Sequence, residues 1–270
     1  MAKIISILNY KGGVAKTTTA INLGTALWIL GKKVLLIDTD AQCNLTGTLG
    51  FDATEGDNTL YEWLKEDDIT PPVYQRYEGL NFIPASRKLL DIESYLMNKR
   101  SRETVLTKRL KTISDYFDYI IIDCSPKEGV LNDNSMTASD GVIVPVECSS
   151  YSMQGMQGIV YSIDDVKNNL NDELNLLGLV IVKYDKGTKI AREAAKYLEK
   201  NFPDKLFKTR IRKCVRFDES PMNHQSIFEF APESNGAEDY IKLAEELSQT
   251  KRKKNWQTIA TKAFEKNLEE

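Results

Sequence analysis

Two lysines, Lys11 and Lys16, lie in one short glycine-containing segment, NYKGGVAKTT, which spans residues 9–18. The segment follows a short apolar run and precedes a helical pattern, which is the context that a phosphate-binding loop requires. Consecutive backbone N–H groups in such a turn bind anions, and the N-terminus of the following helix strengthens the binding. Gly12 and Gly13 permit unusual dihedral angles and let the main chain approach a phosphate. We therefore expect a nucleotide-phosphate site formed by Lys11, Gly12, Gly13, Val14, Ala15, Lys16, Thr17 and Thr18.

A phosphate-binding loop needs only one lysine for its own nucleotide. Lys16 directly precedes Thr17, so it would pair with the β- and γ-phosphates of ATP while the Thr17 hydroxyl ligates Mg²⁺. Lys11 is then a structural accident, a solvated charge or a group with a different target. The ordinary pattern G-x-x-x-x-G-K-[ST] is not met, because Asn9 and Ala15 stand where its glycines should be.

Three aspartates follow apolar runs that resemble buried strands. VLLIDTDAQCN (residues 34–44) contains Asp38 and Asp40, and YIIIDCSP (residues 119–126) contains Asp123. Parallel strands present their carboxyl ends to the ligand crevice, where carboxylates suit Mg²⁺ coordination and the orientation of an attacking water. Any one of these acids could instead cap a helix or lie in a solvated turn. Three such motifs in this order favour a joint site, in which Thr17, Asp38 and Asp123 are the candidate metal ligands.

The composition is that of an ordinary globular chain, with 41% hydrophobic and 28% charged residues among 270. Four scattered cysteines without a C-x-x-C pair argue against a disulfide framework and a zinc knuckle. The single histidine, His224, excludes a multi-histidine metal site and a histidine-based triad. The N-terminus lacks the pattern of a signal peptide, and no apolar run approaches membrane-spanning length. We expect a cytoplasmic protein.

Short apolar runs alternate with helical patterns along the chain. The runs predict strands at residues 4–8, 34–38, 80–84, 119–123, 141–146, 177–182 and 206–211, and helices are expected at 17–30, 103–116, 153–170 and 190–201. The runs are nearly continuous in Val, Ile and Leu, as strands covered on both faces should be. This alternation predicts an α/β fold with a mostly parallel, twisted sheet and helices on both faces. No linker is evident, so we expect one domain over residues 1–250.

Two segments carry excess positive charge, although the net charge is −3. Residues 183–216 contain twelve Lys/Arg against four Asp/Glu, which makes the segment a candidate anion-binding surface. The tail, residues 251–270, begins with KRKK and places Trp256, Ile259, Ala260, Ala263 and Phe264 on one face of a helix. Such a face usually packs on its own protein, but a basic helix of this kind could also meet a partner or an anionic membrane.

The motifs together resemble those of ParA-type ATPases, in the ParA/MinD group of deviant Walker P-loop proteins. The resemblance extends over about residues 2–248. It rests on KGGVAKTT (residues 11–18), DTDAQ (residues 38–42), IIID (residues 120–123), TASD (residues 137–140), VPV (residues 144–146) and ESP (residues 219–221).

The resemblance implies ATP and Mg²⁺ as cofactors and a homodimer that sandwiches two ATP molecules. In this family the first lysine of the loop, here Lys11, reaches the nucleotide of the partner subunit, and Asp40 has the position that activates the hydrolytic water. The ATP-bound dimer would bind DNA without sequence specificity, a ParB-like centromere-binding partner would stimulate hydrolysis, and the protein would associate with the nucleoid. Arg216 matches a DNA-contacting arginine of the family. Further DNA-binding candidates, chosen by charge alone, are Lys183, Lys186, Lys189, Arg192, Arg210, Arg212 and Lys213. Each of these could instead be a solvated surface charge.

Three features depart from the family pattern. Ala15 replaces a glycine, Lys127 and Glu128 alter the switch segment after the second acidic strand, and residues 210–217 lack the proline that relatives place near adenine. We therefore assign no adenine-contacting residue. The sequence names neither the cargo nor the partner.

Two other functions fit parts of the sequence. A MinD-like ATPase that cycles on and off a membrane would need the tail as its anchor, and Glu265, Glu269 and Glu270 weaken that interpretation. An electron-transferring relative that resembles nitrogenase iron protein would need paired cluster cysteines, which the four here do not match.

Overall fold

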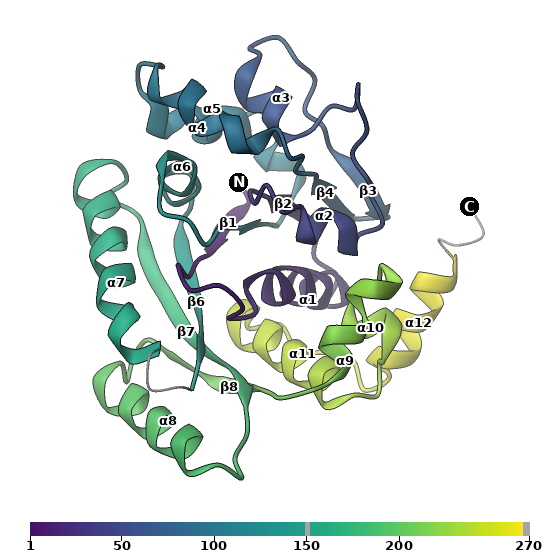
Figure 1. The fold of residues 1–270 in the computed structure, drawn as a ribbon. Helices are drawn as coiled ribbons and strands as arrows, with labels where there is room; N and C mark the ends of the chain where they lie inside the picture. Colours follow the sequence, from purple (N-terminus) through teal and green to yellow (C-terminus); the bar gives the residue numbers. More distant parts are fainter. Residues whose placement is uncertain (149–151, 267–270) are drawn as a thin grey trace.

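Apolar runs form the central strands of an eight-stranded sheet (Figure 1). The computed structural model describes residues 1–148 and 152–266. The strands are β1 (Lys3–Ile7), β2 (Val34–Asp38), β3 (Tyr74–Tyr77), β4 (Leu80–Ile83), β5 (Tyr119–Asp123), β6 (Gly141–Glu147), β7 (Asn175–Tyr184) and β8 (Leu206–Arg212). They lie in the order β3-β4-β2-β5-β1-β6-β7-β8, and every neighbouring pair is parallel except β3 and β4.

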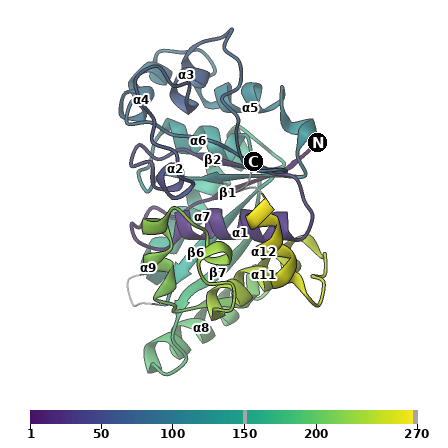
Figure 2. The same cartoon turned by 90° about the vertical axis from the view of Figure 1, so that its right-hand side faces the viewer.

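Helices cover both faces of this sheet, as the continuous apolar strands predict. One hydrophobic cluster joins strand residues such as Leu35 and Ile37 to α3 (Leu60–Lys65), α4 (Leu89–Met97), α5 (Val105–Leu110), α6 (Val130–Thr137), α7 (Ser152–Asn169) and α8 (Lys189–Asn201). The other joins the alternating residues Val34 and Leu36 to α1 (Lys16–Ile29), α10 (Ile227–Phe230), α11 (Asn235–Ser248) and α12 (Trp256–Lys266). Figure 2 shows α11 and α12 on the viewer's side of the sheet. The predicted fold class is confirmed.

Several elements differ from the sequence-based expectation. The helix expected at residues 103–116 is three pieces, the 3₁₀ turns η1 (Arg102–Thr104) and η2 (Ser114–Tyr116) on either side of α5. After Leu110 the chain tightens, because Ile113 donates its N–H to the Leu110 carbonyl at 3.0 Å and is buried in the core. The antiparallel edge strand β3 was not predicted, and neither were α3, α4, α6 and α11. Short segments complete the chain at α2 (Asn44–Thr48), α9 (Arg216–Glu219) and η3 (Pro221–Asn223).

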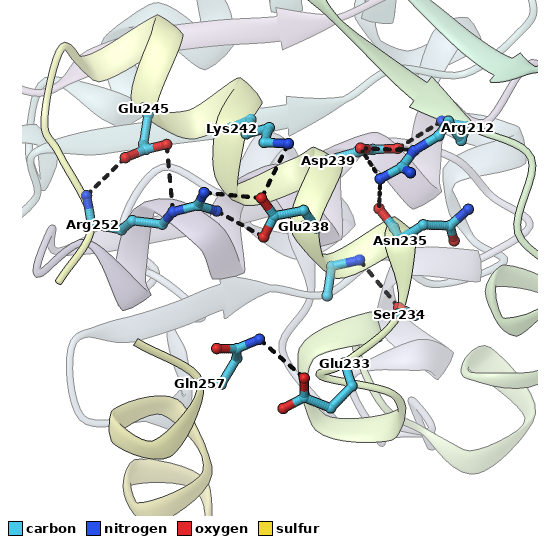
Figure 3. Close-up of polar contacts among 11 residues, drawn as sticks. Arg212, Glu233, Ser234, Asn235, Glu238, Asp239, Lys242, Glu245, Arg252 and Gln257 are labelled. Carbon is cyan, nitrogen blue, oxygen red and sulfur yellow. Dashed lines mark hydrogen bonds and ion pairs between the residues drawn. The ribbon is translucent and has the colours of Figure 1, made fainter. Parts of the chain in front are cut away.

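The C-terminal tail packs on the body of the protein. Trp256, Ala260 and Phe264 of α12 are buried, and the Phe264 ring lies 5.4 Å from that of Trp28 and 5.2 Å from that of Tyr77, measured between centroids. Polar contacts also hold the segment between α11 and α12 (Figure 3). Arg252 of this segment pairs with Glu238 and Glu245 of α11, and Gln257 of α12 donates to Glu233. The apolar face predicted from the sequence is therefore largely internal. Residues 267–270 of the tail, including Glu269 and Glu270, lie outside the described residues.

No helix in residues 1–148 and 152–266 combines the length and the apolar composition needed to cross a membrane.

We predict that Phe264→Ala lowers the free energy of unfolding by about 3 kcal/mol, because it removes a buried aromatic ring and leaves a cavity. Ile259→Ala on the same helix is the matched control. Its side chain is 37% exposed, so the change should be about 0.5 kcal/mol or less. Chemical denaturation of the three proteins measures both effects. Equal small losses would contradict a structural role for α12.

Candidate functional site

The phosphate loop connects β1 to α1 at the carboxyl edge of the sheet (Figure 1). The loop turns through left-handed backbone conformations at Gly13 (φ 73°) and at Ala15 (φ 59°), which immediately precedes α1. Asn9 replaces the first glycine of the ordinary pattern and holds the base of the loop, because its amide donates to the Pro145 carbonyl at 2.8 Å and accepts from the Lys11 N–H at 2.9 Å. The chain therefore fixes this loop to β6 without that glycine.

Lys16 lies inside the loop, and its side chain is almost fully covered. It is 7% exposed, and its Nζ donates to the Lys11 carbonyl at 3.2 Å. Burial lowers its pKa, and the negative charges of Asp123 and Asp40 act in the opposite direction. A buried cation is stabilised by an adjacent anion, so a phosphate group bound in the loop would supply the Lys16 ammonium with an anionic hydrogen-bond acceptor.

Asp38 and Asp123 end adjacent strands and are direct register partners. Asp38 is fully buried, with hydrogen bonds from the Thr46 N–H (2.9 Å) and hydroxyl (2.7 Å) to one oxygen and from the Asp40 N–H (3.0 Å) to the other. Burial nevertheless raises its pKa to about 6. Asp38 thus anchors α2 and the backbone of Asp40, which the sequence did not reveal.

Asp123 has the surroundings that a metal ligand needs. It is 1% exposed, hydrogen-bonds with the Thr17 side chain, and its Oδ1 has no hydrogen-bond partner among the described residues. Burial and the charge of Asp38 raise its pKa well above the usual range. An orphaned, buried carboxylate oxygen beside a hydroxyl fits Mg²⁺. Among residues 1–148 and 152–266, no cluster of three or more His, Cys, Asp or Glu is placed to hold a metal ion.

A cavity of about 510 Å³ lies over the loop. Its lining includes the loop residues Gly12, Gly13, Lys16, Thr17 and Thr18, the acidic Asp40 and Asp218, the basic Lys183 and Lys213, and the apolar Val182, Ile211, Val215 and Phe217. Asp40 borders this space from the turn after β2, where its carboxylate accepts the Gln42 N–H at 3.0 Å. The cavity therefore combines phosphate-loop residues with several apolar side chains, among them Phe217, that suit contact with a flat nucleotide base.

The two loop lysines have different surroundings. Lys16 lines the cavity, whereas Lys11 lies outside the set of described residues that line it. The Lys11 ammonium lies 3.6 Å from a Glu147 carboxylate oxygen at the end of β6, and its side chain is 43% exposed. The two cations therefore have different contacts, since Lys16 borders the cavity and Lys11 pairs with Glu147.

The basic segment predicted to bind DNA spreads over the end of β7, α8, β8 and α9. Lys186, Lys189, Arg192, Lys213 and Arg216 are exposed, with Lys189 near Glu193 and Arg216 paired with Glu219. Arg210 and Arg212 are bound within the protein, since Arg210 pairs with Glu199 and Arg212 forks onto buried Asp239 of α11 (Figure 3).

Lys183 stands apart from this group because its ammonium donates to the Gly13 carbonyl of the phosphate loop at 2.8 Å. Lys127, in the segment that departs from the family pattern, pairs with Glu93 of α4 at 3.2 Å.

The chain is similar to several known proteins over most of its length. A protein-family model described as an AAA domain matches residues 2–176. The chain is 38% identical over 250 residues to the sporulation initiation inhibitor protein Soj of Bacillus subtilis, covering 92% of this chain and 99% of that protein. It is 36% identical over 249 residues to the chromosome partitioning protein ParA of Caulobacter vibrioides, covering 91% and 93%. Cobyrinic acid a,c-diamide synthase from Mycobacterium smegmatis, solved with bound ADP and magnesium, is similar with a TM-score of 0.80 and 30% identity, over 93% of this chain and 98% of that one.

We predict that wild-type protein without nucleotide or metal gains stability relative to Asp38→Asn as the pH falls from 8 to 5. The folded-state pKa of Asp38 is raised to about 6, so between this value and the lower unfolded-state pKa the folded form binds the extra proton. The amide of the variant does not titrate. The difference in unfolding free energy should therefore shift toward the wild type by about 1.4 kcal/mol per pH unit below 6. Denaturant titrations at several pH values test this, and a difference independent of pH would contradict it.

Proposed function

This chain belongs to the ParA/Soj family of partition ATPases, and from that membership we propose that it is an ATP-switched DNA-partitioning ATPase. It is a P-loop ATPase, as the resemblance of its motifs to those of ParA-type ATPases predicted. The observation that carries the finer proposal is the separation of the two loop lysines, with Lys16 in the nucleotide pocket and Lys11 outside it. We propose that Lys16 serves the chain's own ATP, and that Lys11, which pairs with Glu147 in the single subunit, contacts the ATP of a second copy.

The nucleotide site follows from the lining of the cavity. The triphosphate of ATP would lie against the loop N–H groups and Lys16. Its adenine base would lie beside apolar residues of the lining such as Phe217. The Thr17 hydroxyl and the orphaned Oδ1 of Asp123 would hold Mg²⁺, which neutralises the charge that develops on the phosphates. Asp38 would act mainly by positioning Asp40, to which it is hydrogen-bonded.

Asp40 is the residue we propose to orient the attacking water. Its carboxylate borders the cavity beside the loop, and its own backbone is fixed by Asp38. A residue that positions water through one carboxylate gives modest rate acceleration unless further groups complete the site. We therefore expect slow turnover in the isolated chain and stimulation by a ParB-like partner.

Dimerisation would complete the site through Lys11. In the single subunit Lys11 contacts Glu147, an exposed pair that contributes little to stability. A partner's triphosphate offers a much stronger acceptor in a water-poor interface, so the lysine would exchange the carboxylate for phosphate as an ATP sandwich closes.

Non-specific DNA binding would use exposed cations of the basic segment. Lys186, Lys189, Arg192, Lys213 and Arg216 remain candidates, whereas Arg210 and Arg212 are held by acidic partners of the protein itself. Two such segments in one dimer would raise the affinity for the phosphate backbone. A cytoplasmic, nucleoid-associated protein is the expected consequence.

The MinD-like alternative needs an apolar tail face that is free to enter a membrane. The structure places Trp256, Ala260 and Phe264 in the hydrophobic core. Membrane anchoring would first require α12 to leave that core, so the observed packing favours the partition function.

We predict that DNA affinity is higher with a non-hydrolysable ATP analogue than with ADP or no nucleotide, and is indifferent to DNA sequence. The logarithm of the affinity should fall with log salt by roughly 0.9 per phosphate neutralised. Arg216→Glu should weaken binding to all duplexes about equally and flatten this slope. Lys108→Glu is a charge-matched control at an exposed position on α5 and should behave much more like the wild type. Equal affinity of the wild-type protein in all nucleotide states would contradict the proposal.

A further inference from the structure

Lys183, a member of the predicted DNA-binding set, is hydrogen-bonded directly to the phosphate loop. It lies near the end of β7, lines the nucleotide cavity, and donates from Nζ to the Gly13 carbonyl at 2.8 Å. These two residues are 170 positions apart in the chain, so the contact is purely tertiary. A cation that touches the phosphate loop is poorly placed as one more contact to DNA.

The backbone at Lys183 is also unusual. Its φ of 52° lies in the left-handed region, which a residue with a Cβ atom rarely adopts. The pairing of β7 with β8 is irregular at this point, with a shift of register between Ile181 and Tyr184. Strained, irregular backbone of this kind persists where the surrounding contacts impose it. Here the contact that the side chain makes is the one to Gly13.

The residues that follow Lys183 lead directly into the basic segment. The Tyr184 carbonyl accepts the Lys213 N–H at 3.1 Å, and the Tyr184 ring lies 4.9 Å from the Arg210 guanidinium. The Asp185 carbonyl then accepts the N–H and hydroxyl of Thr188, the residue that caps α8.

Beyond the cap, Arg192 of α8 donates back to the Lys186 carbonyl at 2.8 Å. A continuous set of contacts therefore joins Gly13 to the segment that carries Lys186, Lys189 and Arg192.

We propose that Lys183 is the coupling residue between the nucleotide and DNA sites, an inference that rests on the proposed function above. The ammonium has two alternative acceptors, the neutral Gly13 carbonyl and the anionic phosphates of a nucleotide in the same cavity. Charge-assisted hydrogen bonds are the stronger ones, so a bound triphosphate draws Lys183 away from Gly13. Release of that contact lets the end of β7 relax and moves the start of α8. ATP and ADP differ in the charge they present, and this difference biases the two arrangements.

The test measures DNA affinity with ADP and with a non-hydrolysable ATP analogue, and takes the ratio of the two. Lys183→Met keeps the length of the side chain but removes the cation, and should reduce this ratio at least fivefold while the salt slope with the analogue stays unchanged. Lys183→Arg retains a donor and should largely restore the ratio. Lys186→Met is the matched control, three residues further along the chain, and should weaken binding in both states and flatten the slope while the ratio is kept.

Distinct results would overturn the proposal. A wild-type ratio in Lys183→Met excludes coupling through this residue, and a flatter salt slope with that ratio identifies it as a DNA contact instead. Loss of nucleotide binding or of ATP-dependent dimerisation in Lys183→Met would place the residue in the binding machinery itself, which also overturns a coupling role. Equal affinity of the wild-type protein with ADP and analogue removes the switch, so the proposed function then fails together with this inference. Switching retained by both wild type and Lys183→Met overturns the inference alone.

Discussion

The burial of charge at the carboxyl edge of the sheet is the constraint on which the rest of this structure depends. Lys16, Asp38 and Asp123 are all less than a tenth exposed. Burial lowers the pKa of Lys16 and raises the pKa values of the two aspartates, so it favours the neutral form of each side chain. Such groups are tolerated when they are paired or hydrogen-bonded. Thr46 and Thr17 satisfy part of this need, and the remainder matches a triphosphate with Mg²⁺. The site is therefore arranged for a ligand that carries both signs of charge.

The sheet order explains how these groups meet. Strand β5 lies between β1 and β2, so Asp123 is placed beside both the phosphate loop and Asp38. Strands β6 and β7 follow on the other side of β1 and end in Glu147 and near Lys183, which contact Lys11 and Gly13 of the same loop. The loop is thus held by residues from both sides of β1. In the function proposed above, the first contact would be exchanged when a dimer forms and the second would connect the nucleotide to the basic segment.

Sequence patterns predicted the parts of the molecule that are determined by interactions between residues close together in the chain. The apolar strands, the glycine turn and the strand-end acids all follow from short stretches of sequence. Strand β3 was missed because YQRY is a half-exposed edge without an apolar run, and α6 because its buried face contains polar residues such as Asn134. The contacts of Lys11 with Glu147 and of Lys183 with Gly13 join residues more than a hundred positions apart. No spacing rule finds such pairs, since only the folded sheet brings them together.

The most direct test of the account is subunit mixing, because its central claim is that Lys16 serves one subunit's ATP and Lys11 the other's. Lys11→Ala and Lys16→Ala should each abolish ATP-dependent dimerisation and most ATPase activity when assayed alone. Mixed one to one, they can form one intact composite site per heterodimer, with Lys16 from one subunit and Lys11 from its partner. Because neither variant pairs with itself, every dimer in the mixture is a heterodimer with one intact site of two, and the account predicts recovery of up to about half of the wild-type ATPase activity per subunit. No recovery above the sum of the separate proteins, over a range of concentrations at which the wild type dimerises, would contradict the claim.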